Sequence, residues 1–317
     1  MMQLSIVTTL YNSSPYLIEF YERISIQAQE LTNDYEIIFV NDGSPDDSLE
    51  RALNLFQHDQ HVRVIDLSRN FGHHKSMMTG LMHARGELVF LIDSDLEEEP
   101  ELLGEFHKQF HESDVDVVYG VQKSRKGNFI EQISGNLFYR FFNLISSYPV
   151  PLNLITARLM SQRYVKALIE HKDREIFLAG LWAITGFSQQ PIVVTKHFKG
   201  NSSYNIFSKI SILVNSITSF SNTPLIFVFY LGILISSLAG IAAVILVIRR
   251  VFFNELLAGW PSLIVSIWFL GGLTIFCLGI IGIYLAKIFS ETKQRPYTII
   301  KDIYESAIIS DEVNDNP

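Results

Sequence analysis

The stretch Leu88-Val89-Phe90-Leu91-Ile92-Asp93-Ser94-Asp95 decides the fold of this chain. It begins with a wholly apolar run, typical of a buried parallel strand, and ends in two carboxylates one residue apart. Ligands of open α/β sheets bind beyond the carboxyl ends of the strands, and alternate side chains of an extended segment point the same way. We therefore expect Asp93 and Asp95 to face one hard cation, Mg2+ or Mn2+, which could bridge a diphosphate.

A second interpretation treats the same acids as the start of a loop, with Asp95 as the N-cap of the helix that follows. A D-x-D triplet alone is a weak signal. The buried strand before the acids and the polar loops upstream of them favour the cation site.

The composition indicates a membrane protein. Of the 317 residues, 48% are hydrophobic, and the excess lies near the C-terminus. Leu225–Ile248 and Pro261–Ala286 are each long enough to span a bilayer and contain no charged residue. We predict two transmembrane helices, because the alternative, a pair of buried core helices, rarely runs this long without a polar face.

The charge, the cysteine content and the N-terminal sequence further limit which classes of protein this chain could belong to. The chain moves from Met1 directly into a strand-like run at Leu4, without a secretory signal, so we expect the globular part to face the cytoplasm. Cys277 is the only cysteine and lies in the second apolar segment, which excludes a disulfide framework or a cysteine-based zinc cluster. A net charge of −8 without a basic block argues against nucleic acid as a partner.

The first third of the chain alternates strand and helix signals, which predicts βαβ units and a largely parallel sheet. The predicted strands are Leu4–Thr9, Tyr35–Val40, Val62–Leu67, Leu88–Ile92 and Val115–Gly120. The loop Asn41-Asp42-Gly43-Ser44 is either a plain turn or part of a nucleotide site. Neither G-x-G-x-x-G after the first strand nor G-x-x-x-x-G-K-[ST] occurs, which disfavours dinucleotide oxidoreductases and P-loop NTPases.

An ordered set of motifs extends along nearly the whole chain, to about Tyr304. Besides the two apolar segments, it comprises Thr9–Asn12, Val40–Ser44, Leu67–Gly72, Asp93–Leu96, Pro100-Glu101, Arg158–Met160, Phe177 with Gly180-Leu181, and Lys293–Tyr297. In this set the chain resembles the inverting nucleotide-sugar glycosyltransferases of family 2, and in particular the membrane-anchored polyprenyl-phosphate glycosyltransferases that act on undecaprenyl or dolichyl phosphate. The resemblance implies a GT-A-type, Rossmann-like, mostly parallel α/β sheet with amphipathic interface helices and two C-terminal transmembrane helices.

The resemblance also implies a domain order. It consists of a cytoplasmic GT-A domain (1–204), a juxtamembrane amphipathic helix (205–223), a membrane domain (224–288) and a cytoplasmic C-terminal tail (289–317). We expect a multi-pass protein of the bacterial inner (cytoplasmic) membrane, disordered from Ser306 onward. Phe129–Ser147 has apolar residues near helical spacing, and either the membrane interface or the sheet could cover them.

Site roles follow from the resemblance, residue by residue. The matching donor-binding positions are Thr9, Tyr11, Asp42, Arg69 and Asp93; the metal positions are Asp93, Asp95 and Glu97; the catalytic positions are Asp95, Arg158 and Thr156; and the phosphate or lipid-phosphate positions are Arg125, Lys199 and Ser202. Asp42 resembles the acid that binds the pyrimidine base, and Asp95 the principal ligand of Mg2+ or Mn2+. For Arg125 and Lys199, a solvated surface charge is an equally open alternative.

Three positions depart from the family pattern. Thr156 stands where close relatives carry the acid sometimes assigned as catalytic base, Ser203 where they commonly carry lysine, and Ser13 where they carry glutamate. The first two changes keep open a catalytically silent, nucleotide-sugar-binding membrane protein.

The missing acid bears on the acceptor. A hydroxyl acceptor, as in polysaccharide or lipid-linked glycan synthesis, would need a base worth about 10²–10⁴-fold. A phosphate monoester is already anionic at neutral pH, because its second pKa is near 6. We therefore expect metal-dependent, inverting transfer of one sugar from a UDP- or dTDP-sugar to undecaprenyl phosphate, for cell-surface glycan or O-antigen modification. Small residues such as Gly271 and Gly279 would permit close helix packing in a homo-oligomer.

Overall fold

The computed structural model describes residues 2–122, 151, 153–174, 176–195, 218, 221–253 and 259–306. The chain divides into two compact units. The first unit contains Met1–Arg140, Tyr148–Tyr204 and Arg295–Pro317, and the second contains Phe141–Ser147 and Asn205–Gln294. The C-terminal segment therefore belongs to the same unit as the N-terminal strands.

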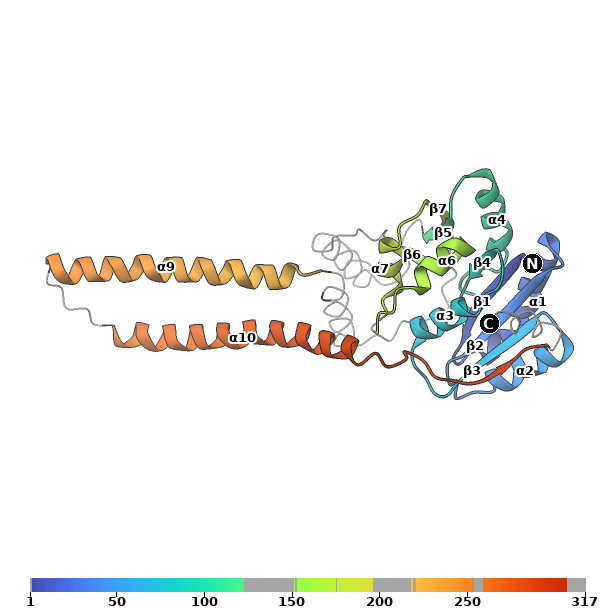
Figure 1. Ribbon diagram of the computed structural model, residues 1–317, viewed down its shortest axis with the longest axis horizontal. Coiled ribbons are helices and arrows are strands. Elements are labelled where there is room, and N and C mark those ends of the chain that lie inside the picture. Colours follow the sequence, from blue (N-terminus) through green and yellow to red (C-terminus); the bar gives the residue numbers. More distant parts are fainter. Residues whose placement is uncertain are drawn as a thin grey trace, which may run out of the picture. The chain divides into compact units, whose positions relative to one another are not determined.

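Eight strands of the described residues form one mixed sheet in the order β7-β5-β6-β4-β1-β2-β3-β8 (Figure 1). They are β1 (Leu4–Leu10), β2 (Tyr35–Asn41), β3 (Val62–Leu67), β4 (Leu88–Leu91), β5 (Val117–Gln122), β6 (Leu154–Ser161), β7 (Gln189–Val194) and β8 (Ile300–Tyr304). The strands β4, β1, β2 and β3 are parallel, and β5 is parallel to β7. Strand β6 runs antiparallel between β4 and β5, and β8 runs antiparallel to β3. The predicted mostly parallel α/β sheet is confirmed.

Helices pack on both faces of the central strands. The helices described in this unit are α1 (Ser14–Leu31), α2 (Ser48–His58), α3 (His73–Met82), α4 (Leu102–Glu112), α6 (Gln162–Ile169) and α7 (Leu178–Ile184). Ile6 of β1 belongs to the hydrophobic core that contains Phe20 of α1, whereas the next residue, Val7, lies against Gly80 of α3. Strands β1 and β2 are buried along their whole length, which explains why most of their residues are apolar.

The first four predicted strands end within a residue of the observed ones, and Val62–Leu67 agrees at both ends. The fifth is Val117–Gln122, two residues later than predicted at each end. Strands β6, β7 and β8 were not predicted, because their partners lie far away in the sequence.

Two long helices make up most of the described part of the second unit, α9 (Thr223–Phe253) and α10 (Trp260–Thr292). The two helices contact each other, and the Tyr284 hydroxyl donates a hydrogen bond of 2.6 Å to the Ser221 carbonyl. Within the described residues, one segment, Ser266–Thr292 of α10, is long and apolar enough to cross a membrane, with a mean hydropathy of 2.2. The prediction of two membrane spans is thus supported for α10 alone.

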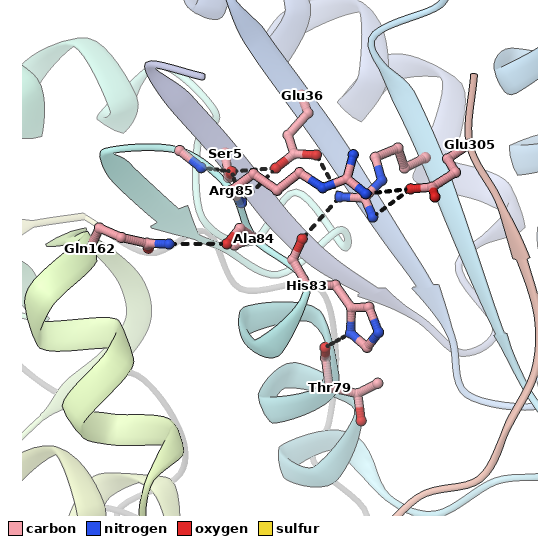
Figure 2. A network of polar contacts seen from close by, with 10 residues as sticks. Ser5, Glu36, Thr79, His83, Ala84, Arg85, Gln162 and Glu305 are labelled. Carbon is pink, nitrogen blue, oxygen red and sulfur yellow. Dashed lines mark hydrogen bonds and ion pairs between the residues drawn. The ribbon is translucent and has the colours of Figure 1, made fainter. Parts of the chain in front are cut away.

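The chain returns from α10 to the edge of the sheet through β8. Beyond this strand, Glu305 joins a buried charge network that consists of Ser5, Glu36, Arg63, Arg85 and Glu305 (Figure 2). Glu36 accepts hydrogen bonds from the Ser5 hydroxyl at 2.6 Å, from Arg63 Nη1 at 2.6 Å and from the Arg85 backbone N–H at 2.8 Å. Glu305 Oε2 lies 2.9 Å from Arg63 Nη2 and 2.7 Å from Arg85 Nη2. Two carboxylates and two guanidinium groups thereby balance one another.

Candidate active site

The two acids of the opening stretch lie in a tight turn after β4. Between them, Ser94 is only 4% exposed, and its hydroxyl donates to the Thr9 carbonyl at 2.9 Å. Asp93 and Asp95 are partly exposed, and Asp95 Oδ1 accepts the Glu97 backbone N–H at 2.9 Å. Leu96 has a φ of +58°, which lets the chain reverse at this point. The turn buries the serine against β1 and leaves both acids partly exposed.

Asp93 is contacted from two sides. The Thr156 hydroxyl donates to Asp93 Oδ2 at 2.8 Å, and His73 Nε2 lies 3.1 Å from Asp93 Oδ1. The other ring nitrogen of His73, Nδ1, lies 3.0 Å from the Thr9 hydroxyl. Burial alone would lower the pKa of His73, but the hydrogen bond with Asp93 and the nearby negative charges outweigh it, so this pKa is raised.

Strand pairing explains how Thr156 comes to face Asp93. In the antiparallel register of β4 and β6, Leu88 pairs with Ser161 and Leu91 with Arg158, so the paired numbers add to 249. Continuing this register two residues beyond Leu91 places Thr156 opposite Asp93, since 93 and 156 also add to 249. Thr156 here acts as a hydrogen-bond donor to a carboxylate.

Glu98 holds the same segment of β6 through its backbone. It is 1% exposed, and its carboxylate accepts the backbone N–H groups of Thr156 at 3.0 Å and Ala157 at 2.8 Å. A buried carboxylate is tolerated where it is hydrogen-bonded in this way. Glu98 is therefore a structural support of the site.

Asp42, predicted to bind the base, holds the loop after β3. Its Oδ1 accepts the Phe71 backbone N–H at 2.7 Å, and its Oδ2 accepts the Gly72 backbone N–H at 3.0 Å. The neighbouring Gly43 has a φ of +60°, and a Cβ there would lie 2.5 Å from the Asn70 backbone nitrogen. The two loops that follow β2 and β3 therefore pack backbone against backbone, which only glycine permits at this point.

The other predicted donor-binding residues border the same edge of the sheet. Thr9 is 6% exposed and contacts His73, whereas Tyr11 is half exposed. The Arg69 guanidinium lies 4.1 Å from the centre of the Phe71 ring and donates to the Asn70 carbonyl at 2.9 Å. Thr9 is therefore linked through His73 to Asp93. Arg69 lies on the loop that Asp42 holds.

Arg158, predicted as catalytic, is 1% exposed and lies inside the unit. Its guanidinium stacks at 2.9 Å from the ring centre of Trp182 and donates to the carbonyls of Ile155 and Thr156. Burial lowers the pKa of Arg158, although the charges of Tyr164, Glu98 and Tyr119 oppose this shift. In this arrangement Arg158 shapes the start of β6, and a direct role in chemistry stays a prediction. Arg125, Lys199 and Ser202 lie outside the described residues.

The turn offers carboxylates for a divalent cation. No group of three histidine, cysteine, aspartate or glutamate side chains poised to hold a metal occurs among the described residues. Mg2+ in nucleotide sites is commonly held by one or two carboxylates, with water and substrate phosphates as the other ligands. Asp95 and Asp93, hard oxygen donors one residue apart and partly exposed, fit a cation of this kind. Glu97 is also partly exposed and follows in the same turn.

Comparison with known proteins identifies the family. The sequence model for glycosyl transferase family 2 matches residues 5–169, more than half of the chain. This chain belongs to glycosyl transferase family 2. The match covers β1 to β4 and the Asp93–Asp95 turn, so the predicted family is confirmed.

Similar proteins align along nearly the whole chain. A Mycobacterium tuberculosis protein named as a putative glycosyltransferase is 53% identical over 98% of this chain and 91% of its own length. The bactoprenol glucosyl transferase of Shigella phage SfV is 30% identical, over 95% of this chain and 99% of its own length. Among solved structures, glucosyl-3-phosphoglycerate synthase of M. tuberculosis in complex with Mn2+, UDP and phosphoglyceric acid has a TM-score of 0.51 at 15% identity, covering 69% of this chain and 78% of its own. That likeness shows a shared fold.

Two residues of the site were not found from the sequence, His73 and Glu98. His73 directly follows the motif that ends at Gly72, and this position was the available signal. Glu98 is one of three successive glutamates, which gave no indication of which one is buried.

Proposed function

We propose that this family 2 glycosyltransferase moves one sugar from a UDP- or dTDP-sugar to a polyprenyl phosphate, such as undecaprenyl phosphate, at the cytoplasmic face of a membrane. The observation that carries the proposal is the full-length similarity to bactoprenol glucosyl transferases, which includes the α10 segment able to cross a membrane. An enzyme that carries a membrane-spanning segment and uses a lipid as its acceptor would act at the surface of a bilayer.

The geometry around Asp93 supports a phosphate acceptor. Thr156 donates its hydroxyl hydrogen to Asp93, so it is oriented as a donor rather than as a base. A phosphate monoester brings its own negative charge to the anomeric carbon and needs no proton removed. The protein's residues then have to orient the donor and exclude competing geometries. Such positioning alone can raise the reaction rate by several orders of magnitude.

Roles for the individual residues follow. Asp95, with Asp93 beside it, would hold Mg2+ or Mn2+, and this cation would neutralise charge on the departing nucleoside diphosphate. The loop held by Asp42 would line the nucleotide, with Tyr11 exposed beside it. Attack from the face opposite the leaving group would invert the anomeric centre.

The direct test is transfer by the purified full-length chain. Protein in detergent is incubated with undecaprenyl phosphate, Mn2+ and a panel of radiolabelled UDP- and dTDP-sugars, and organic-phase label is counted. We expect label from one donor, which chelation by EDTA and Asp95→Ala both abolish. Label that appears on a hydroxyl acceptor instead, or donor binding without any turnover, would contradict the proposal in favour of polysaccharide synthesis or of a silent binding protein, respectively.

A further inference from the structure

His73 lies at the centre of the contact chain around Asp93. Its side chain is 51% exposed, and its two ring nitrogens contact Asp93 and Thr9, on the ends of β4 and β1. With the Thr156 hydroxyl on the other carboxylate oxygen, the chain Thr9–His73–Asp93–Thr156 links the ends of four elements, β1, α3, β4 and β6. No motif that identified the family assigns a role to this histidine.

The positions of the hydrogens in the Thr9–His73–Asp93–Thr156 contacts follow from which atoms can accept a hydrogen bond. A carboxylate can only accept, so the 3.1 Å contact between His73 Nε2 and Asp93 Oδ1 is favourable when Nε2 carries the hydrogen. The Thr9 hydroxyl can either donate to Nδ1 or accept from it. Both ring nitrogens thus contact other residues of the protein. This arrangement suits a side chain that holds another residue in place, rather than one that offers a free nitrogen to the substrate that receives the sugar.

The position of His73 is itself fixed by the loop before it. Helix α3 begins at His73, and its N-cap, Gly72, has a φ of +103°, a conformation that side chains other than glycine rarely adopt. The backbone N–H groups of Phe71 and Gly72 both donate to Asp42. Asp42 therefore sets the point where α3 starts, and α3 sets the direction from which His73 reaches Asp93.

We propose that His73 is a positioning residue that holds Asp93 in the orientation in which Asp93 and Asp95 together receive the cation and diphosphate of the donor. This inference rests on the proposed function, which supplies the nucleotide-sugar donor, and it assigns one further residue, His73, to the site. Residues that orient a metal-binding carboxylate typically change metal affinity or activity by about 10–100-fold when they are replaced. Without the His73 ring, Asp93 would lose the contact at its Oδ1 and keep the hydrogen bond that Thr156 donates to its Oδ2.

Two replacements separate the contacts of the ring. The amide nitrogen of glutamine can reach the position of Nε2 and so the Asp93 carboxylate, whereas the shorter asparagine reaches only the position of Nδ1, beside Thr9. We expect His73→Asn to raise the Mn2+ concentration for half-maximal transfer by about 10–100-fold. His73→Gln should stay close to wild type. The neighbouring exposed histidine provides the matched control, His74→Asn, since its Nδ1 lies 3.1 Å from the Ile176 carbonyl and it should leave the Mn2+ requirement unchanged.

A second readout avoids turnover. Isothermal titration of the full-length protein with UDP and with dTDP, with and without Mn2+ and without acceptor, should show Mn2+-dependent binding that His73→Asn weakens and His73→Gln retains. Thermal unfolding of each variant checks that the fold is intact.

The outcomes separate the two proposals. Equal Mn2+ requirements for His73→Asn and His73→Gln, or a fall in kcat at an unchanged Mn2+ requirement, would overturn the positioning role. Retained Mn2+-dependent nucleotide binding with the expected variant pattern, but without transfer to undecaprenyl phosphate, would sustain the role of His73 and refute the acceptor. A wild-type protein whose nucleotide binding ignores Mn2+ would refute the inference itself.

Discussion

The buried charge network and the Asp93–Asp95 turn belong to the same sheet but differ in exposure. In the network, the side chains of Arg63 and Glu36 are 2% and 1% exposed, and carboxylates and guanidinium groups pair within the chain. In the turn, the Asp93 side chain is 15% exposed and is contacted by Thr156 and His73, and Asp95 accepts the Glu97 backbone N–H. Removing one charge from a buried pair leaves its partner uncompensated and so costs stability, whereas partly exposed acids held in place at a turn suit a ligand that arrives later.

The largest expected effect is on the network. Glu36→Gln removes the carboxylate that faces Arg63 and leaves a guanidinium group buried with less compensation, so it should lower the free energy of unfolding by about 3–5 kcal/mol. Thermal or denaturant unfolding of the full chain in detergent measures this loss. Glu19→Gln, which breaks an exposed pair with Arg23, is the control and should cost well under 1 kcal/mol.

A double replacement tests the reason for that effect. Glu36→Leu combined with Arg63→Met removes both charges and should restore part of the stability lost in Glu36→Gln. If the double variant is less stable than the single one, the network contributes more than charge balance.

The second effect concerns activity at the turn. Asp95→Asn keeps an acceptor oxygen for the Glu97 backbone N–H but removes the negative charge, so transfer should fall by about 10²–10³-fold. Its unfolding free energy should stay within about 0.5 kcal/mol of wild type, unlike that of Glu36→Gln. Asp47→Asn, at an exposed acid paired with Arg51, should change neither quantity. Parallel losses of stability and activity in Asp95→Asn would remove the distinction between the two clusters.

The third effect concerns the loops that place the site. Gly43→Ala would bring a Cβ against the Asn70 backbone at a φ of +60°, so it should cost about 1–3 kcal/mol and weaken nucleotide binding. Gly104→Ala, inside α4, meets only the flexible end of Gln27 at 3.2 Å and should be neutral or stabilise by up to about 1 kcal/mol. Equal behaviour of the two variants in titrations with UDP would show that the loop contact does not matter.

The smallest effect is expected at the rim of the network. Glu305 is 27% exposed, so water can partly replace its bonds to Arg63 and Arg85, and Glu305→Gln should cost about 1–2 kcal/mol. Asp302→Asn, at a more exposed acid of the same segment, is the control. A loss as large as that of Glu36→Gln would mean that the C-terminal segment, rather than the buried pair, determines the stability of the network.

Local pattern was sufficient to predict the central strands and the turn after β4. Short runs rich in apolar residues marked β1 to β4, and the end of the wholly apolar run of β4 located Asp93 and Asp95. The roles of Thr156 and Arg158 depend on the insertion of antiparallel β6 between β4 and β5, more than sixty residues along the chain from Asp93. No local period reports such a pairing, so the sequence could not tell that Thr156 would meet Asp93 or that Arg158 would be buried on Trp182.

The C-terminal strand was missed for a related reason. Lys301 and Asp302 give the segment a polar character typical of a tail, and its apolar residues Ile299 and Ile303 remain exposed. Its place in the sheet depends on pairing with β3 and on the Lys301–Asp66 and Glu305–Arg63 ion pairs, which connect residues more than two hundred positions apart.

The position of β8 sets an order for biosynthesis. A ribosome that makes this chain from its N-terminus completes β1 to β7 and both long helices before it reaches Ile300–Tyr304. The sheet therefore acquires its final edge strand, Arg63 its second carboxylate, and the Arg85 guanidinium group its contact with Glu305, only after the α10 segment has been synthesised. A nascent chain that stalls within α10 would carry an unfinished catalytic unit with an open β3 edge, the kind of edge that quality-control proteases and chaperones recognise.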